Sequence, residues 1–450
     1  MAAETKLAPR PPQYIVFSFD GGKSHDMWRR SLAFADKITR EGKPLRFTYF
    51  VSAVYFVTRK NRKLYDAPGR GRGRSAIGWA SSDKGDIAAR MAYMRAARNG
   101  GHEIASHAVG HFDGKTWSAA DWASEFRQFD ALLARAQRMT GAGGTTRADR
   151  EFANGGLVGF RAPQLGTSPG LWKQMKRFGM RYDSSRVGKR GNWPKRTAQG
   201  FWNFPLAVLP LAGSSRRTLS MDYNFYVSQS KGEPNPALSG YYERQTFTTY
   251  VNYFKHNFYG NRAPMHVANH FSLWNNGAYW RAMKRFARMV CGLEEVRCVT
   301  YRELASILDA QPRGRLAAWQ RGAFRRKGPM LLVRAPRDVV TVREVKVASL
   351  DGADGSTLPQ IKPPRAETGV AQPPKPPTRR RRAARPERQK PAVTQPTRTT
   401  KKRSAPPRAP RVKTVRARPT PRPRTSPRPR RRSFSQRFMQ RYRSGFNDGN

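Results

Sequence analysis

The chain of 450 residues carries 86 lysines and arginines against 30 aspartates and glutamates, which gives a formal net charge of +56. Roughly +23 of this charge lies between residues 351 and 450, and about +33 belongs to the rest of the chain. Such a charge favours polyanionic partners, namely nucleic acid, acidic wall polymers or anionic membrane surfaces, and says nothing about the fold. Two cysteines exclude a disulfide-rich scaffold and a cysteine-rich zinc site, and no apolar run approaches the ~18 residues of a membrane span.

Composition divides the chain into four segments. An N-terminal extension, residues 1–12, lacks the apolar core of a secretory signal. The main domain, residues 13–310, alternates short apolar runs with helix-like stretches. A connecting segment, residues 311–352, holds one or two strand candidates after Pro329. A tail rich in proline and arginine, residues 353–450, offers almost nothing apolar to bury and is predicted to be a disordered basic segment.

The main domain predicts five strands and seven helices in alternation. The strands are expected at Tyr14–Phe19, Leu45–Val51, Glu103–Ser106, Val158–Phe160 and Val296–Thr300. The helices are expected at Met27–Arg40, Ile87–Asn99, Ala119–Thr140, Pro169–Phe178, Thr246–Phe258, Gly277–Val290 and Tyr301–Asp309. This order is typical of β/α units around a parallel sheet or barrel. Residues 59–85, which contain the run GRGRGRS, interrupt the alternation and are expected to form a surface insertion.

The first expected strand ends at a single carboxylate. Apolar and β-branched residues run from Tyr14 to Phe19, Asp20 follows, and the pair Gly21-Gly22 then breaks the strand. A lone carboxylate at the carboxyl end of a buried strand calls for a functional reason, so we expect Asp20 to take part in the chemistry of this protein.

Histidines recur at a spacing that suits metal binding. His107 and His111 lie four residues apart, just after a short expected strand. On one helical turn this spacing puts two imidazoles on the same face, where both can bind one metal ion. The same spacing also fits two ordinary polar residues near a strand end. The chain has only 7 histidines, however, and His266 and His270 repeat the spacing, which favours the metal hypothesis.

Further candidate residues follow along the chain. Arg161 and Pro163 come straight after a short expected strand, where a guanidinium can hold a nearby carboxylate ionised and fix its orientation. Taken alone, an arginine before a turn proline is more often an ordinary surface residue. Asp183 lies in the run RYDSS, and Trp193 follows ten residues later.

The order of these pieces resembles that of the polysaccharide deacetylases, the carbohydrate esterase family 4 with the NodB-like domain, and chitin deacetylase-like members above all. The run FSFDGG is similar to the opening T-F-D-D-G of the family, and GHEIASHAVGH to its G-H-E-I-x-x-H-[ST]-x-x-H. The runs RFTYFVS, GFRAPQL, YDSS, GFWNFPL and VRCVTYRELASIL resemble five more family motifs in family order. The resemblance extends from about Tyr14 to Leu308, which is roughly two-thirds of the chain.

The resemblance implies a distorted (β/α) barrel of the NodB-homology type, with its site at the carboxyl ends of the strands. It further implies a hydrolase that removes N-acetyl groups from an amino-sugar polysaccharide, such as peptidoglycan or a chitin-like glycan, with zinc or cobalt as cofactor. In this scheme the metal is bound by His107 and His111 and the base is Asp20. The remaining implied roles are orientation of the base by Arg161, protonation of the leaving amine by His270, orientation of His270 by Asp183, and substrate contacts by Trp193 and Pro163.

One family residue is missing from this chain. The second aspartate of the family pair supplies a third metal ligand, and Gly21 stands at its position. An alignment shifted by one would make Asp20 that ligand, but it would set Phe19 on the base. Two imidazoles and water hold a divalent ion less well than two imidazoles and a carboxylate. We therefore expect a substitute ligand such as Asp26 or His25, a weakly held metal, or a loss of catalysis.

Two other functions compete with the deacetylase. A carbohydrate-binding pseudoenzyme is favoured by Gly21, although an idle site has no physical need for the other polar residues. A nucleic-acid-binding protein is favoured by the basic tail, whose composition fits sequence-blind phosphate binding. In the deacetylase reading, residues 353–450 hold the enzyme near an anionic surface or polymer. The resemblance favours an extracellular or periplasmic location, and Cys291 and Cys298 form either a disulfide or two free thiols.

Overall fold

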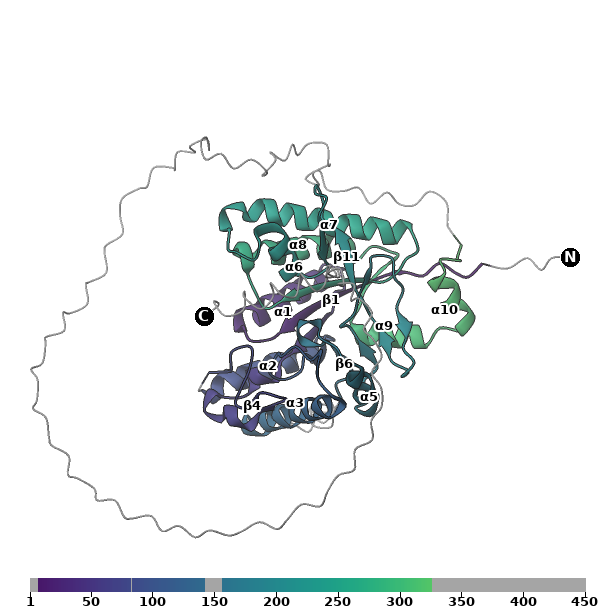
Figure 1. The fold of residues 1–450 in the computed structure, drawn as a ribbon. Helices are drawn as coiled ribbons and strands as arrows, with labels where there is room; N and C mark the ends of the chain where they lie inside the picture. Colours follow the sequence, from purple (N-terminus) through teal and green to yellow (C-terminus); the bar gives the residue numbers. More distant parts are fainter. Residues whose placement is uncertain (1–6, 82, 142–155, 326–450) are drawn as a thin grey trace, which may run out of the picture. The chain divides into compact units, whose positions relative to one another are not determined.

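The structure is a computed structural model that describes residues 7–81, 83–141 and 156–325 (Figure 1). The strands expected after Pro329 and the predicted disordered tail, residues 353–450, lie outside the described residues.

A nine-stranded sheet forms the centre of the described domain. Its strand order is β13-β1-β2-β5-β6-β7-β10-β9, and β14 also pairs with β1. Neighbours from β13 to β10 run parallel, and the β10–β9 pair is antiparallel. The strands are β1 (Gln13–Gly21), β2 (Phe47–Val51), β5 (Glu103–Ser106), β6 (Gly159–Phe160), β7 (Tyr182–Asp183), β9 (Lys195–Arg196), β10 (Trp202–Asn203), β13 (Met265–His270) and β14 (Val296–Cys298).

Two small sheets accompany the main one. The first has the order β12-β11-β8, and a bridge between Met221 and Ala268 joins the segment that follows β12 to strand β13. Its strands are β8 (Val187–Lys189), β11 (Leu206–Pro210) and β12 (Arg217–Leu219). The second is the hairpin of β3 (Asp66–Ala67) and β4 (Gly71–Arg72). The main sheet curls, and the first small sheet stands between its two ends, so the fold is the distorted (β/α) barrel that the sequence predicted.

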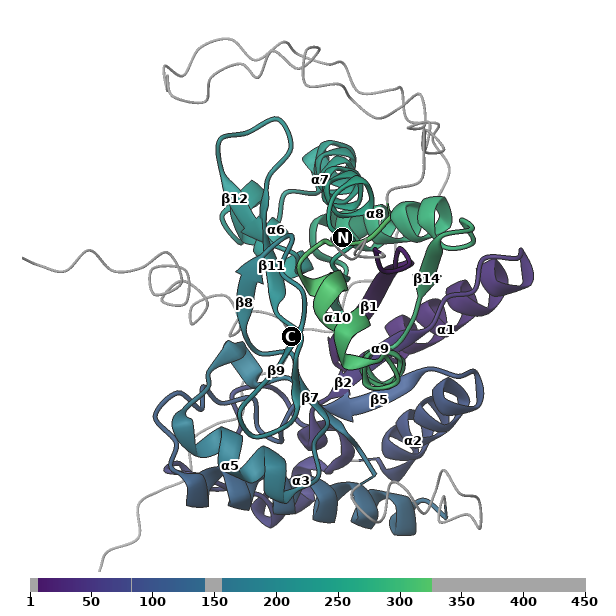
Figure 2. The same cartoon turned by 90° about the vertical axis from the view of Figure 1, so that its right-hand side faces the viewer.

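Helices surround the strands, with α1 near α2, α3 near α5, and α7 near α8 (Figure 2). The helices are α1 (His25–Arg40), α2 (Lys84–Asn99), α3 (Ala119–Met139), α5 (Pro169–Arg177), α6 (Asp222–Ser230), α7 (Ser239–Tyr259), α8 (Trp274–Val290), α9 (Tyr301–Asp309) and α10 (Arg313–Gln320). Four short 3-10 helices complete the described elements: η1 (Ala53–Phe56), η2 (Arg59–Leu64), η3 (Pro163–Leu165) and η4 (Pro236–Leu238). No helix in the described part of the chain is both long and apolar enough to cross a membrane.

Alternation along β1 decides which side chains face the barrel interior. Phe17 and Phe19 pack in the apolar layer beneath the outer helices, where Phe17 contacts Phe286 of α8. Val16 lies in the separate interior cluster. Successive side chains of a strand point to opposite faces, so Asp20 shares the interior face with Val16. The carboxylate that ends β1 therefore points into the mouth of the barrel.

The expected strands and helices are present, with ends that differ by a few residues. The sequence analysis did not predict strands β7, β9, β10 and β13, the two small sheets, or helices α6 and α10. The packed domain also continues past residue 310, since the indole of Trp319 on α10 donates to the carbonyl of Pro9 at 2.7 Å. Cys291 and Cys298, which the sequence left open, form a disulfide across the turn between α8 and β14.

Candidate active site

The end of β1 carries a buried ion pair. Asp20 is 3% exposed, and Nη1 of the fully buried Arg161 donates to its Oδ1 at 2.6 Å. Arg161 follows β6 directly, and β6 lies three strands away from β1 in the sheet. The side chain therefore crosses the mouth of the barrel to reach Asp20, which agrees with the orienting role expected for Arg161.

The rest of the guanidinium is also fully engaged. Its Nη1 donates to Ser18 Oγ at 3.1 Å, and its Nη2 donates to Ser184 Oγ at 3.0 Å and to the Tyr301 hydroxyl at 3.1 Å. Cζ of Arg161 lies 4.2 Å from the centre of the Phe50 ring, in cation–π contact. A buried charge is tolerated when it is paired and hydrogen-bonded. These contacts fix the position of Arg161 and, through it, that of Asp20.

His107 and His111 stand together in an irregular loop after β5, with ring centres 5.0 Å apart. The expectation of a helical turn was wrong, because Ala108 has φ +57° and His111 has φ +60°, which a right-handed helix does not allow. The two rings lie close together because the loop backbone takes left-handed φ values at Ala108 and His111 instead of helical ones. Positive φ at residues other than glycine is uncommon and clusters at functional sites.

The two imidazoles are neutral, and that of His107 has a fixed tautomer. The Nδ1–H of His107 donates to the carbonyl of Arg161 at 2.8 Å, which leaves its Nε2 as an acceptor. Burial lowers the pKa of His107 to about 3 and holds the pKa of His111 well below its ordinary value. Both rings are therefore neutral at physiological pH. A hydrogen bond from the second ring nitrogen to a carbonyl is the usual way in which a metal-binding histidine is oriented.

His270 ends strand β13 and lies directly opposite Asp20 in the register of the β1–β13 pair. The pKa of His270 is raised: burial alone would lower it, but the carboxylate of Asp222 outweighs burial, and Asp20 adds a smaller effect. The Asp222 carboxylate accepts from Nδ1 of His270 at 2.6 Å and from its backbone N–H at 2.8 Å. The proposed acid is therefore protonated over a wider pH range than an ordinary histidine.

The expectation that Asp183 orients His270 was wrong, because Asp222 occupies that position. Asp183 lies at the end of β7, where its Oδ1 accepts from the hydroxyl and the backbone N–H of Ser185. Its Oδ2 is buried and has no hydrogen-bond partner among the described residues, and burial raises the pKa of Asp183 to about 6. Asp183 therefore supports the loop after β7 and does not touch His270.

The two residues expected to contact substrate lie in different places. Pro163 is buried in the short helix η3, next to Gln164, which donates to the carbonyl of His111 at 3.2 Å. Trp193 is 5% exposed, packs against Trp319, and donates to the carbonyl of Asn261, which precedes the amino end of β13. The site lies at the other end of that strand, so Trp193 is not placed to contact a substrate there.

An aromatic residue that the sequence reading missed stands beside His270. The ring of Trp274 lies 5.3 Å from that of His270 and stacks on Tyr226, and it is only partly buried. The residue follows His270 by four positions, in the run HFSLWNN. No pattern in the sequence separates Trp274 from the many buried aromatic residues of this chain.

Gly21, where the family has the second aspartate, has room for a Cβ. Leaving out its chain neighbours, a Cβ added there would come within 4 Å of one described atom, Cε2 of Tyr55, at 3.8 Å. The backbone there has φ +108°, however, which L-residues rarely adopt. Asp26 does not replace the carboxylate, since its Oδ2 accepts from Arg30 at 2.5 Å on the exposed side of α1. His25 bonds Asp86 instead.

The donor set fits two positions of a divalent metal site. Two neutral imidazoles, one with a fixed tautomer, are the ligands that zinc and cobalt accept. Among the described residues, however, no group of three or more histidine, cysteine, aspartate or glutamate side chains could hold a metal ion. A metal bound here would take two protein ligands, His107 and His111, and complete its coordination with water or substrate.

Comparison with known proteins finds solved structures that match this chain at low sequence identity. No family model matches the chain, and no curated protein matches it in sequence. Several solved structures that match are polysaccharide deacetylases or esterases of carbohydrate esterase family 4, the family that the sequence motifs resemble.

Three of these structures illustrate the range. A protein assigned as a polysaccharide deacetylase from Mycobacterium smegmatis has a TM-score of 0.42 and 16% identity, over 68% of this chain and 96% of that chain. An allantoinase has a TM-score of 0.39 and 14% identity, over 66% and 90%. A mutant of a family 4 pseudoenzyme with restored enzymatic activity has a TM-score of 0.34 and 10% identity, over 66% and 72%. Similarity at this level does not transfer an activity to this chain.

Proposed function

We propose that this protein hydrolyses N-acetyl groups of an amino-sugar polysaccharide, with a divalent metal bound by His107 and His111. The observation that carries the proposal is the pair Asp20 and His270, which face each other on adjacent strands and are each held by a buried ionic partner. Amide hydrolysis needs one group to take a proton from water and another to give a proton to the leaving amine.

Asp20 is the proposed base. Its carboxylate is oriented by the guanidinium of Arg161, which is itself fixed by Ser18, Ser184 and Tyr301. The free side of the carboxylate takes the proton of the water that attacks the acetyl carbonyl. A divalent ion, when bound by the two imidazoles, would polarise that carbonyl and lower the pKa of the water.

His270 is the proposed acid. Asp222 accepts from its Nδ1, so in the protonated ring the second proton sits on Nε2, from which it passes to the departing amine. The raised pKa of His270 extends this protonated form to higher pH than in an ordinary histidine. The adjacent ring of Trp274 offers an apolar surface for the sugar that bears the amine.

Acetate release from penta-N-acetylchitopentaose tests the proposal. Chelation should abolish release, and zinc or cobalt should restore it in the wild type but not in His107→Ala. The exposed His256 on helix α7 supplies a matched control, since His256→Ala removes a histidine outside the site. Acetate release that persists after chelation would contradict the role of the metal.

A pseudoenzyme that binds the glycan without turning it over is the second candidate. One observation favours it: the third ligand position is occupied by Gly21, and Asp26 does not fill it. This candidate predicts oligosaccharide binding, measured by calorimetry, with no acetate release at any zinc concentration.

A further inference from the structure

The insertion that interrupts the barrel carries an unusual charge. We define the basic insertion as residues 59–76, between η1 and α2. It holds seven arginines and lysines and one acidic residue, Asp66. The seven basic residues are all exposed: Arg59, Lys60, Arg62, Lys63, Arg70, Arg72 and Arg74. Within the described part of the chain, the ion pair of this insertion joins Arg72 to Asp66 at 3.8 Å, and both side chains are mostly exposed.

The basic insertion is held in a defined conformation. The backbone N–H of Gly73 donates to the carbonyl of Tyr65 at 2.8 Å, beside the hairpin of β3 and β4. Gln128 of α3 fixes this hairpin from below, since it accepts from the N–H of Asp66 and donates to its carbonyl. The backbone that carries the basic side chains is therefore held in one conformation. Because folding has already ordered this backbone, binding a partner costs less conformational entropy.

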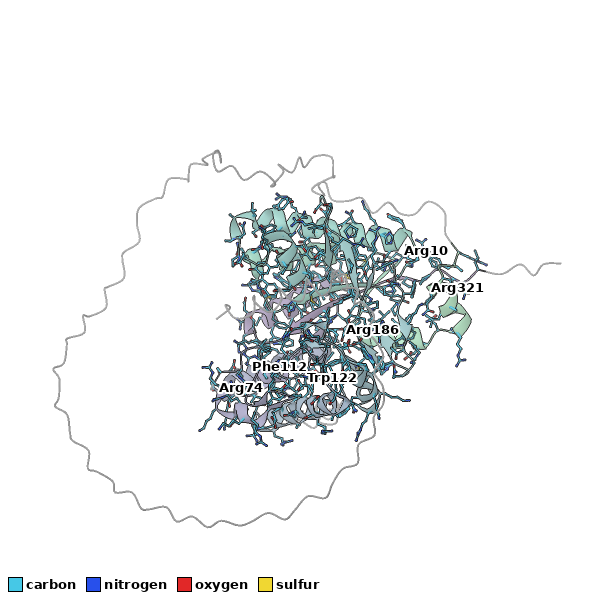
Figure 3. All side chains as sticks on the ribbon, in the orientation of Figure 1. Arg10, Arg74, Phe112, Trp122, Arg186 and Arg321 are labelled. Atoms are coloured by element: carbon cyan, nitrogen blue, oxygen red, sulfur yellow. A yellow bond between two sulfur atoms is a disulfide. The ribbon has the colours of Figure 1, made fainter. Side chains whose placement is uncertain are left out.

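The same insertion is bonded to the loop that carries His111. The carbonyl of Gly110 accepts from the N–H of Ala76 at 2.8 Å and from the hydroxyl of Ser75 at 3.3 Å. Arg70 lies 5.6 Å from the ring centre of Phe112, the residue after His111. Figure 3 labels Phe112 and Arg74, a basic residue of the insertion.

A second link runs through a buried carboxyl group. Glu125 of α3 accepts from the Tyr65 hydroxyl at 2.9 Å and from the N–H of Val109 at 2.8 Å. Val109 and Gly110, which lie between His107 and His111, are thus tied to the basic insertion. The insertion therefore packs against the loop that carries the two histidines.

We propose that the basic insertion binds a negatively charged stretch of the same glycan whose acetylated sugar occupies the site. This proposal rests on the proposed function and adds that the substrate is acidic. Closely spaced cations attract a polyanion and raise its local concentration. The exposed side chains of the insertion are cationic, apart from Leu64 and from Asp66, which pairs with Arg72, and its aromatic residue Tyr65 is buried. Proteins that bind single-stranded nucleic acid add exposed aromatic platforms, so an acidic glycan fits this surface better.

Charge removal on the full-length protein tests the proposal. Arg62, Arg72 and Arg74→Gln removes three charges from the insertion, and Arg313, Arg315 and Arg321→Gln removes three exposed charges at helix α10 as a matched control. Binding of a fluorescent hyaluronan octasaccharide, which alternates carboxylate-bearing and N-acetylated sugars, is measured at low ionic strength. Neutral penta-N-acetylchitopentaose is the uncharged probe.

The insertion variant should bind hyaluronan about tenfold more weakly than the wild type, and the control variant should change less than twofold. Arg→Lys at the same three positions should restore binding, because the charge is retained. Binding of the neutral oligosaccharide should not change.

Several outcomes would overturn the proposal: equal losses in the insertion and control variants, a loss for the neutral probe as well, no hyaluronan binding by the wild type, or a larger loss for a single-stranded DNA 20-mer than for hyaluronan. Because binding is measured without turnover, a failure of the proposed deacetylation leaves this result readable on its own.

Discussion

The two halves of the candidate site differ in completeness. In the proposed proton-transfer half, Asp20 and His270 each have a charged partner. The guanidinium of Arg161, the partner of Asp20, also donates hydrogen bonds to Ser184 and Tyr301. In the metal half, His107 and His111 are placed and neutral, but Gly21 stands where a third ligand is expected. The residues proposed to move protons therefore have ordered partners. A metal ion, by contrast, would find fewer protein ligands than the family pattern provides.

The largest effect is expected from the base. Asp20→Asn keeps the size of the side chain and the bond to Arg161 but removes the proton acceptor, so kcat for acetate release should fall about 10³-fold. Steady-state kinetics on penta-N-acetylchitopentaose measures this change. A loss of less than tenfold would show that another group takes the proton, and the proton-transfer half would need a new assignment.

The next effect concerns the acid and its partner. The acid must be protonated, so activity is lost as pH rises through the raised pKa of His270. Asp222→Asn removes the carboxylate that raises this pKa, and the alkaline limb of the kcat profile should therefore move to lower pH, with a loss of about 10²-fold at pH 8. Asp183→Asn is the matched control and should leave the limb in place. If Asp183→Asn moved it instead, the assignment of Asp222 would be wrong.

The metal half can be completed by a substitution. Gly21→Asp adds a carboxylate at a position where a Cβ has room, and under the proposed function it should tighten zinc binding about tenfold. The φ of +108° at this position should also lower the free energy of unfolding by about 1–3 kcal/mol. Gly21→Ala carries the same strain without the carboxylate and separates the two effects. Equal zinc affinities in both variants would place the metal elsewhere.

The smallest effect is expected from the residue that seemed able to replace the missing ligand. Asp26 bonds Arg30 on the outer side of α1, so Asp26→Ala should change zinc affinity less than twofold, as measured by titration calorimetry. A tenfold loss would mean that the β1–α1 loop rearranges when the metal binds.

The sequence predicted the site residues that stand at strand ends. Asp20, Arg161 and His107 each follow an apolar run, and the carboxyl ends of parallel strands meet at one edge of a sheet. Their proximity therefore follows from the β/α order alone. The same reasoning gave the class of fold and most of the outer helices.

The wrong predictions concern residues whose positions depend on the path of the chain or on the local backbone conformation. Asp222 meets His270 across 48 residues through the bridge between Met221 and Ala268, and no spacing in the sequence records that bridge. Asp26 is close to Asp20 in sequence, but the first turn of α1 directs it toward solvent. Ala108 and His111 have left-handed φ values, which alanine and histidine in a sequence do not predict.

Zinc content of purified Asp20→Asn and His107→Ala, beside the wild type, tests most directly whether Asp20 is the base and His107 a metal ligand. We expect the wild type and Asp20→Asn each to bind one zinc ion per chain with similar affinity, whereas His107→Ala should lose it. Loss of zinc from Asp20→Asn would contradict the proposed role of Asp20, because it would make Asp20 the missing third ligand and leave the base unassigned.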